Sequence, residues 1–417
     1  MIRLIEALNF RCLQYISQPL GRFHVLVGPN ASGKTTFLDV VAFLARLVSD
    51  GPEAAVRDRT RNFQDLVWGG AGERFELAIE AEIPADQRAK LSKGFDTIRY
   101  EVALGQSAET NGIGIIEEYV LLKRPAQASS EQRRLFPRHI EAPRTIIAHK
   151  KTTGTRCVLS KSPGGNDNFY SEVLEESGKG WFPSIKLGPK KSALGTLPPV
   201  ESRFPASTWL KELLAERVQS LVLNSLFIRQ ASPPGQVRGF KPDGSNLPWV
   251  IEDLRRSKER FADWIAHLQT ALPDLEDIQT IDREDDRHRY LLLCYRGGLK
   301  VPSWTASDGT LRLLALTLPA YLPDFRGIYL IEEPENGIHP RAIEPLFQSL
   351  SSAYDAQILV ATHSPVILSA AQPEQVLCFK KTDEGASDIV SGREHPALQQ
   401  WRRDIDLGSL FAAGVLG

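Results

Sequence analysis

The chain has 417 residues, of which 42% are hydrophobic and 24% are charged, and its formal net charge is -1. These values are typical of a soluble globular protein with enough apolar residues for one large or two ordinary domains. They exclude the overall basic surface that many nucleic-acid-binding domains carry. No apolar run approaches the length of a bilayer span, and Arg3 and Glu6 interrupt the first apolar stretch, so we predict neither a membrane segment nor a signal peptide. The four cysteines are scattered without a C-x-x-C pair, which favours a reducing, cytoplasmic location.

The first elements lead into a phosphate-binding loop. Residues 2–15 alternate like one strand, and the apolar run 23–27 predicts a second strand. Residues 28–35 then match G-x-x-x-x-G-K-[ST], and helical spacing follows from Thr36 to Leu44. A strand, a glycine-rich turn and a helix in this order aim backbone N–H groups and a positive helix terminus at one anion. Lys34 is expected to reach the β- and γ-phosphates of a nucleotide and Thr35 to ligate Mg²⁺. The predicted nucleotide-binding residues of this loop are Asn30, Ala31, Ser32, Gly33, Lys34, Thr35 and Thr36.

The middle of the chain changes character twice. Residues 73–83, 98–104 and 113–122 alternate apolar and polar side chains, which predicts half-exposed strands of an antiparallel sheet. From 123 to about 205 the periodicity weakens, and we predict an irregular insertion with short strands at 145–148 and 156–159. Helical spacing returns at 207–218 and 248–272, and a hairpin is predicted with arms at 278–281 and 288–295.

Three further segments carry chemistry. Ser307 to Thr310 form a small-residue turn before an apolar helix, which is either a second anion site or an ordinary helix cap. The apolar strand 327–331 ends in Glu332 and Glu333, and such acids can hold a metal ion and activate a water molecule. Neighbouring strand residues face opposite ways, so Glu332 is expected on the metal side and Glu333 toward the γ-phosphate. The apolar strand 357–361 delivers His363 at its carboxyl end, where open α/β sheets place their chemistry.

Taken in this order, the four segments resemble the ATPase heads of the ABC superfamily. Within it the chain is similar to the SMC and RecF-like branch, especially to the AAA-type ATPases of bacterial anti-phage defence operons and of overcoming-lysogenization-defect nucleases. The strings Asn9-Phe10-Arg11 and 243–247 (Asp-Gly-Ser-Asn-Leu) also resemble that group. The resemblance covers about residues 1–105 and 220–370, and no known motif covers 123–205.

The resemblance implies roles for individual residues. Lys34 would be catalytic, Glu333 the general base and His363 the sensor of the γ-phosphate. Mg²⁺ would be held by Thr35 and Glu332, where transporters carry Asp instead of Glu332, and the nearest candidate for the glutamine of the metal shell is Gln64. Arg11 would contact the nucleotide, while Ser307 and Gly309 would cap the ATP that a second subunit binds. ATP and Mg²⁺ are the implied cofactors, and the implied assembly is a homodimer around ATP, with a higher oligomer left open.

The expected fold is an α/β ABC-type P-loop ATPase head with a mixed central sheet, an antiparallel β subdomain and an inserted α/β region. We predict an N-terminal lobe at 1–122, an insertion at 123–290 and a C-terminal lobe at 291–417. Only 54 residues follow His363, too few for an appended nuclease domain of ordinary size. We therefore expect the chain to regulate an effector protein that a neighbouring gene encodes.

The alternative is a repair ATPase of the RecF or SMC kind that binds DNA. A third interpretation, the cytoplasmic subunit of a transporter, is disfavoured by the long insertion and the missing Ser-Gly-Gly-Gln turn. The acidic residues 282–286 are read as a solvated turn rather than a metal site. Basic pairs occur at 133–134, 190–191, 255–256 and 402–403, and they are expected to be solvated more often than to contact DNA.

Overall fold

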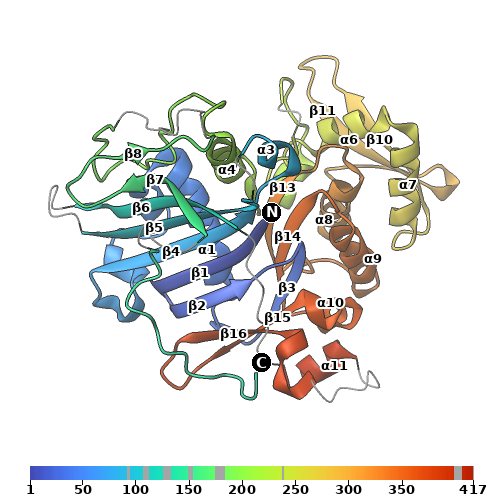
Figure 1. Ribbon diagram of the computed structural model, residues 1–417. Coiled ribbons are helices and arrows are strands. Elements are labelled where there is room, and N and C mark those ends of the chain that lie inside the picture. The colour runs from blue at the N-terminus through green and yellow to red at the C-terminus, as the bar shows by residue number, and fades with distance from the viewer. Residues whose placement is uncertain are drawn as a thin grey trace.

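A computed structural model describes residues 1–91, 94–106, 112–124, 133–148, 154–173, 184–236, 239–398 and 406–416. Three sheets organise these residues, and two of them meet near the N-terminus (Figure 1). A seven-stranded sheet has the order β2-β1-β4-β5-β6-β7-β8, and a six-stranded sheet has the order β16-β15-β3-β14-β13-β9. A small third sheet, β10-β11-β12, lies beside helices α6 and α7 (Figure 1).

The seven-stranded sheet is antiparallel throughout. The predicted single strand at 2–15 is wrong, because the chain reverses at Arg11 and the two halves pair as a hairpin. Asn9 and Arg11 have φ of 58° and 53°. Residues other than glycine seldom adopt this left-handed backbone conformation, so strand propensity alone does not reveal the reversal. The three strands predicted at 73–122 are confirmed. The strands are β1 Ile2–Phe10, β2 Leu13–Pro19, β4 Arg74–Glu82, β5 Thr97–Gln106, β6 Ile113–Lys123, β7 Thr155–Lys161 and β8 Asn168–Phe169.

The six-stranded sheet is parallel apart from one edge strand. Its strands β9, β13, β14, β3 and β15 run in one direction, and β16 returns antiparallel to β15. All residues of β3 and β14 are buried, as expected for parallel strands covered on both faces. The bounds are β3 Phe23–Val27, β9 Val218–Leu221, β13 Gly327–Glu332, β14 Ala356–Ala361, β15 Val376–Lys381 and β16 Ser387–Ser391.

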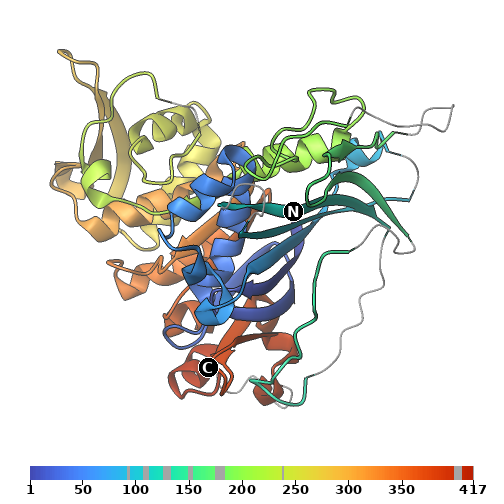
Figure 2. The same ribbon diagram turned by 90° about the vertical axis from the view of Figure 1, so that its left-hand side faces the viewer.

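Helix α1 (Lys34–Asp50) joins the two large sheets. Its buried face carries Phe43, whose ring lies 5.7 Å from that of Phe10 on β1 and 5.5 Å from that of Phe75 on β4. Leu44 and Val40 belong to the same core, which also takes in residues of β14 and β15. The helix that follows the phosphate loop is therefore held from both sides, which fixes the loop relative to both sheets (Figure 2).

Residues 247–302 form two helices and a small sheet. The helix predicted at 248–272 is two helices, α6 Leu247–Arg255 and α7 Lys258–Gln269, because Ser257 leaves the helical conformation (φ -94°, ψ 88°). The break lets Leu254 and Trp264 face the same core. The predicted hairpin at 278–295 is confirmed as β10 Leu275–Asp282 and β11 Arg289–Tyr295, with β12 Lys300–Pro302 beside it. The other helices are α2 Pro52–Arg57, α3 Ala85–Arg88, α4 Pro205–Glu216, α5 Ser225–Arg229, α8 Asp308–Thr317, α9 Pro340–Ser351, α10 Pro365–Ala370 and α11 Leu407–Ala412.

Residues 133–148, here called the strap, begin at the β15–β16 hairpin and end on the outer face of the seven-stranded sheet (Figure 2). At the sheet, Glu76 accepts hydrogen bonds from the Thr145 hydroxyl (2.8 Å) and the Ile146 N–H (2.7 Å). Glu101 accepts from the Ala148 N–H at 2.8 Å. The strand predicted at 145–148 does not form, because side chains rather than a neighbouring strand satisfy this extended backbone.

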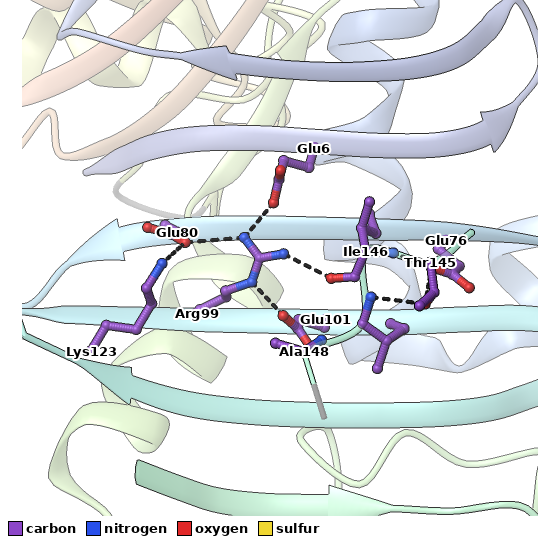
Figure 3. Close-up of polar contacts among 10 residues, drawn as sticks. Glu6, Glu76, Glu80, Arg99, Glu101, Lys123, Thr145, Ile146 and Ala148 are labelled. Carbon is purple, nitrogen blue, oxygen red and sulfur yellow. Dashed lines mark hydrogen bonds and ion pairs between the residues drawn. The ribbon is translucent and has the colours of Figure 1, made fainter. Parts of the chain in front are cut away.

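The strap covers a network of buried charges centred on Arg99 (Figure 3). The Arg99 guanidinium pairs with Glu6, Glu80 and Glu101 and also donates to the Ile146 carbonyl at 3.1 Å. Lys123 of β6 pairs with Glu80 of β4, across the intervening strand β5. The expectation of half-exposed strands is therefore wrong, since the polar face of the sheet is covered and its charges are satisfied internally.

The predicted insertion at 123–290 contributes strands to both large sheets. Strands β7 and β8 of the predicted insertion extend the antiparallel sheet, and β9 extends the six-stranded sheet. Within the described ranges, no helix has both the length and the hydropathy needed to span a membrane.

Candidate nucleotide-binding site

A cavity of about 410 Å³ opens at the carboxyl ends of β3, β13 and β14. Parallel strands end together at this edge, which is why segments far apart in the chain meet here. The cavity brings together the following predicted residues: Arg11, Asn30, Ala31, Ser32, Gly33, Lys34, Thr35, Thr36, Glu332, Glu333 and His363.

The phosphate loop is shaped by two glycines. Gly28 has φ of 150°, and a β-carbon there would lie 2.2 Å from the Phe379 carbonyl oxygen. Gly33 has φ of 105°, and its β-carbon would lie 2.3 Å from the Ser387 hydroxyl. Any side chain at either position would collide with the β15–β16 hairpin, so the loop can approach this hairpin only through glycine.

Lys34 lies inside the loop, with only 7% of its surface exposed. Its ammonium group donates to the carbonyls of Gly28 (2.8 Å) and Pro29 (3.0 Å). Burial lowers the pKa of Lys34, while the charges of Glu333 and Glu332 act in the opposite direction. The loop thus holds a partly desolvated cation on weak carbonyl acceptors, which a phosphate oxygen can replace.

The two acids at the end of β13 both line the cavity. The Thr35 hydroxyl donates to Glu332 at 2.6 Å, so two oxygen ligands suited to Mg²⁺ lie side by side. Glu333 follows the last residue of the strand with φ of 47°, and this turn brings its side chain to the same cavity as its neighbour. Its carboxylate accepts from the Asn336 amide at 2.5 Å.

The donor set fits one Mg²⁺ bound together with phosphate oxygens. Among the described residues, no group of three or more His, Cys, Asp or Glu side chains could enclose a metal ion. Mg²⁺ commonly takes only one or two protein ligands and completes its octahedron with phosphates and waters. Thr35 and Glu332 are the residues that would hold it.

His363 is positioned by a carboxylate from the neighbouring loop. Glu335 accepts a hydrogen bond from the Thr362 hydroxyl at 2.6 Å and from the His363 N–H at 3.0 Å. Thr362 in turn bonds through its N–H to the Leu26 carbonyl of β3 at 3.1 Å. The loops after β13 and β14 are thus tied to the strand that carries the phosphate loop.

Three predicted residues lie off the cavity walls. Ser307 is exposed and caps α8 by accepting from the Thr310 N–H at 3.1 Å. Gly309 lies against the turn after β13, where its β-carbon would come within 2.3 Å of the Gly337 carbonyl oxygen. The carbonyl oxygen of the Gln64 side chain is buried and has no hydrogen-bond partner among the described residues, and the role of Gln64 in the metal shell stays a prediction.

Sequence reasoning missed two polar side chains of the cavity, Cys12 and Lys381. Cys12 follows the unforeseen reversal at Arg11, so its position could not be inferred from one continuous strand. Lys381 ends strand β15, two residues after the apolar run Val376–Phe379, and the same carboxyl-end argument that selected His363 could have found it.

The family model for "AAA domain, putative AbiEii toxin, Type IV TA system" matches residues 23–155 and 162–369. The chain belongs to this family. A short stretch of 41 residues is also 46% identical to the OLD nuclease of Thermus scotoductus (strain ATCC 700910 / SA-01), and it covers 10% of this chain and 8% of that protein. The chain therefore matches only a small part of that relative's length.

Two solved structures show the fold. The head of an SMC protein bound to the C-terminal winged-helix domain of ScpA is 14% identical, with a TM-score of 0.53 over 94% of this chain and 97% of that one. The Smc head domain with an extended coiled coil, bound to the C-terminal domain of ScpA derived from Pyrococcus furiosus, is 13% identical, with a TM-score of 0.51 over 94% and 96%. The predicted α/β fold of an SMC-type head is thus confirmed, in a chain of the AAA-domain family named above.

Proposed function

We propose that this family member is a Mg²⁺-dependent ATPase that works as a switch in the cytoplasm. Two copies close around ATP, and the closed dimer controls a separately encoded effector of an anti-phage defence system. The observation that carries the ATPase part is the convergence of Lys34, the Thr35–Glu332 pair, Glu333 and His363 on one cavity.

The residues of the cavity divide the work of phosphoryl transfer among them. Bound Mg²⁺ would neutralise charge that develops on the phosphates, and Thr35 and Glu332 are placed to hold it. Lys34 exchanges its loop carbonyls for phosphate oxygens. Glu333 accepts the proton of the attacking water, which requires its carboxylate to leave the Asn336 amide. His363 contacts the γ-phosphate from the loop that Glu335 fixes.

The dimer is supported by what a single copy lacks. Ser307 lies at an exposed helix start that does not line the cavity of its own chain. Large apolar side chains nearby are exposed to water, among them Leu226 (69%), Phe227 (47%) and Trp304 (47%). Apolar groups gathered next to an anion-binding helix start suit a surface that a second copy covers. The assignment of 1–122, 123–290 and 291–417 as lobe, insertion and lobe remains part of this proposal.

The decisive experiment substitutes the base. Glu333→Gln should stop hydrolysis yet keep nucleotide bound, so the variant with Mg-ATP should accumulate as a dimer on light scattering. Ser307→Arg should prevent turnover while sparing nucleotide binding. A Glu333→Gln protein that stays monomeric at saturating Mg-ATP would contradict the composite site, and a full-rate Ser307→Arg protein would remove Ser307 from it.

The effector part is supported by the toxin–antitoxin description of the family and by the likeness to a segment of an OLD nuclease. At least one residue of each described basic pair is engaged in an ion pair: Arg133 with Asp388, Lys190 with Glu53, Arg255 with Asp277 and Arg256 with Asp253. The pair 402–403 lies outside the described residues. Co-expression with the neighbouring genes, scored by phage plating with and without Glu333→Gln, tests this part. Salt-dependent DNA binding that stimulates hydrolysis would favour the repair ATPase instead.

A further inference from the structure

The nucleotide cavity contains a third cation, Lys381, for which the phosphate-loop motif gives no role. It is the last residue of β15, its side chain lines the cavity, and it is exposed. No ion pair or hydrogen bond of its ammonium group is found among the described parts of the chain. Lys381 therefore differs from the two other cations of the cavity, which have partners.

Those two cations are already compensated. Arg11 pairs with Asp39 at 3.2 Å, and Asp39 is shared with Arg59. Lys34 bonds to loop carbonyls and lies in the field of Glu332 and Glu333. A triphosphate carries about four negative charges, of which one Mg²⁺ cancels two. An uncompensated ammonium at the cavity wall is the group with most to gain from such a ligand.

The backbone around Lys381 is held in place from the side of the phosphate loop. Strand β15 pairs with β3, so that Cys378 lies beside Val27, the last residue before the loop. The Ser387 N–H, opposite Lys381 on β16, donates to the Cys12 carbonyl at 3.0 Å. The glycine contacts at 28 and 33 bring the hairpin against the loop without a spacer.

The strap holds the same hairpin from its other side. Asp388 is buried and accepts from the Arg133 guanidinium (2.8 Å) and the Arg138 N–H (2.9 Å). Phe136 lies against His395 with ring centroids 5.1 Å apart. Lysine on a hairpin fixed from two sides loses less freedom when it binds than a lysine on a loose loop.

We propose that Lys381 is a nucleotide-binding residue that contacts the polyphosphate of ATP, and that the β15–β16 hairpin presents it to the phosphate loop. This inference rests on the proposed function, because it assumes that the cavity takes a nucleoside triphosphate. It adds to the site a cation that lies 347 positions from Lys34 in the chain.

The test measures binding of a fluorescent ATP analogue, 2′/3′-N-methylanthraniloyl-ATP, with Mg²⁺ to the full chain. Lys381→Ala should weaken binding about tenfold, the usual worth of one hydrogen bond to a charged group. Lys381→Arg should restore most of the affinity. The affinity of Lys381→Ala should also depend less steeply on salt, because one exposed charge contact is gone.

Lys380→Ala is the matched control, since Lys380 is the adjacent lysine of β15, does not line the cavity and points to the other face of the strand. It should bind the analogue within about twofold of the parent chain, a difference too small for a lost charged contact. Equal affinity of Lys381→Ala and the parent chain would overturn the inference. So would an equal loss in Lys380→Ala, or failure of arginine to rescue, since either points to the hairpin's packing. If the parent chain binds no analogue while it is folded by circular dichroism, the proposed function itself fails, together with this inference.

Discussion

Two regions of the molecule use the same residue types in opposite ways. At the edge of the six-stranded sheet, Lys34, Lys381, Glu332 and Glu333 surround an open cavity. On the outer face of the seven-stranded sheet, Arg99 and Lys123 meet Glu6, Glu80 and Glu101 under the strap (Figure 3). In the first region the charges line a cavity, and in the second they satisfy one another and the backbone of the strap.

The difference teaches how to separate binding sites from structural charge clusters. Every carboxylate around Arg99 has a partner inside the chain, so that region has little to gain from a ligand. The cavity has an ammonium without a partner among the described residues and a lysine held only by carbonyls. The number of charges alone would not distinguish the two regions. They differ in whether the charged side chains form ion pairs and whether other parts of the chain cover them.

The largest expected effect is on stability. Arg99→Leu leaves the buried carboxylate of Glu101 and the partly buried one of Glu6 without their cation, and breaking a buried pair in this way costs about 3–5 kcal/mol. The free energy of unfolding, measured with urea, should fall by that amount. Nucleotide affinity of the protein that remains folded should not change. A loss of nucleotide affinity without a loss of stability would show that Arg99 serves the cavity and not the fold.

Lys34→Ala should show the reverse pattern. Removing a preorganised cation from a phosphoryl-transfer site lowers turnover by about 10²–10³-fold. Because burial already lowers the pKa of Lys34, its removal relieves desolvation, and the urea midpoint should stay unchanged or rise slightly. Phosphate release and urea denaturation on the same preparation check both halves. A clear drop in stability would show that Lys34 also serves the fold.

The two large sheets should respond differently to a fall in pH. Burial lowers the pKa of His24, on the strand before the phosphate loop, to about 4, and its Nε2 accepts from the Gly21 N–H at 2.6 Å. The unfolded chain therefore binds this proton more readily, so stability is complete above pH 6.5 and falls between pH 6.5 and 4, by about 3 kcal/mol in all. Burial raises the pKa of Glu118 on β6 of the other sheet, so the contribution of Glu118 to stability increases as the pH falls.

Hydrogen exchange at pH 7 and pH 5 checks this prediction. Amides of β3 should lose protection before those of β6 as the pH falls. A His24→Gln variant is the matched control, because an amide can accept the same bond without titrating. If β3 in that variant loosens as much as in the parent chain, His24 is not the cause.

The smallest effect is expected at a surface pair of the same antiparallel sheet. Arg3 and Glu82 form an ion pair with 48% and 40% of their side chains exposed. Arg3→Ala should change the free energy of unfolding by less than about 1 kcal/mol. Measured beside Arg99→Leu, it shows whether burial rather than charge makes the difference. Equal losses in the two variants would contradict that view.

The sequence predicts one region far better than the other, for a physical reason. Residues 28–35, Glu332, Glu333 and His363 each follow a short apolar strand, so local pattern and the carboxyl-end argument place them together. The strap has no such pattern, because its extended backbone is held by Glu76 and Glu101, which lie tens of residues away in the chain. Nothing local marks those acids as buried. The reversal at Arg11 was equally hidden, since it depends on a backbone conformation that the residue type disfavours.

A close contact links Gly309 to the turn after β13. Its α-carbon abuts the Gly337 carbonyl, and the preceding residue, Asn336, holds the carboxylate of Glu333. A methyl group at position 309 would push this turn away and shift the carboxylate of Glu333 even in an isolated subunit. The exposed start of α8 and the carboxylate of Glu333, which lines the cavity, are thus linked through Gly309 and Gly337. A loss of activity in Gly309→Ala would therefore reflect a change within its own chain. A substitution of Ser307 is the better test of the proposed contact between two copies.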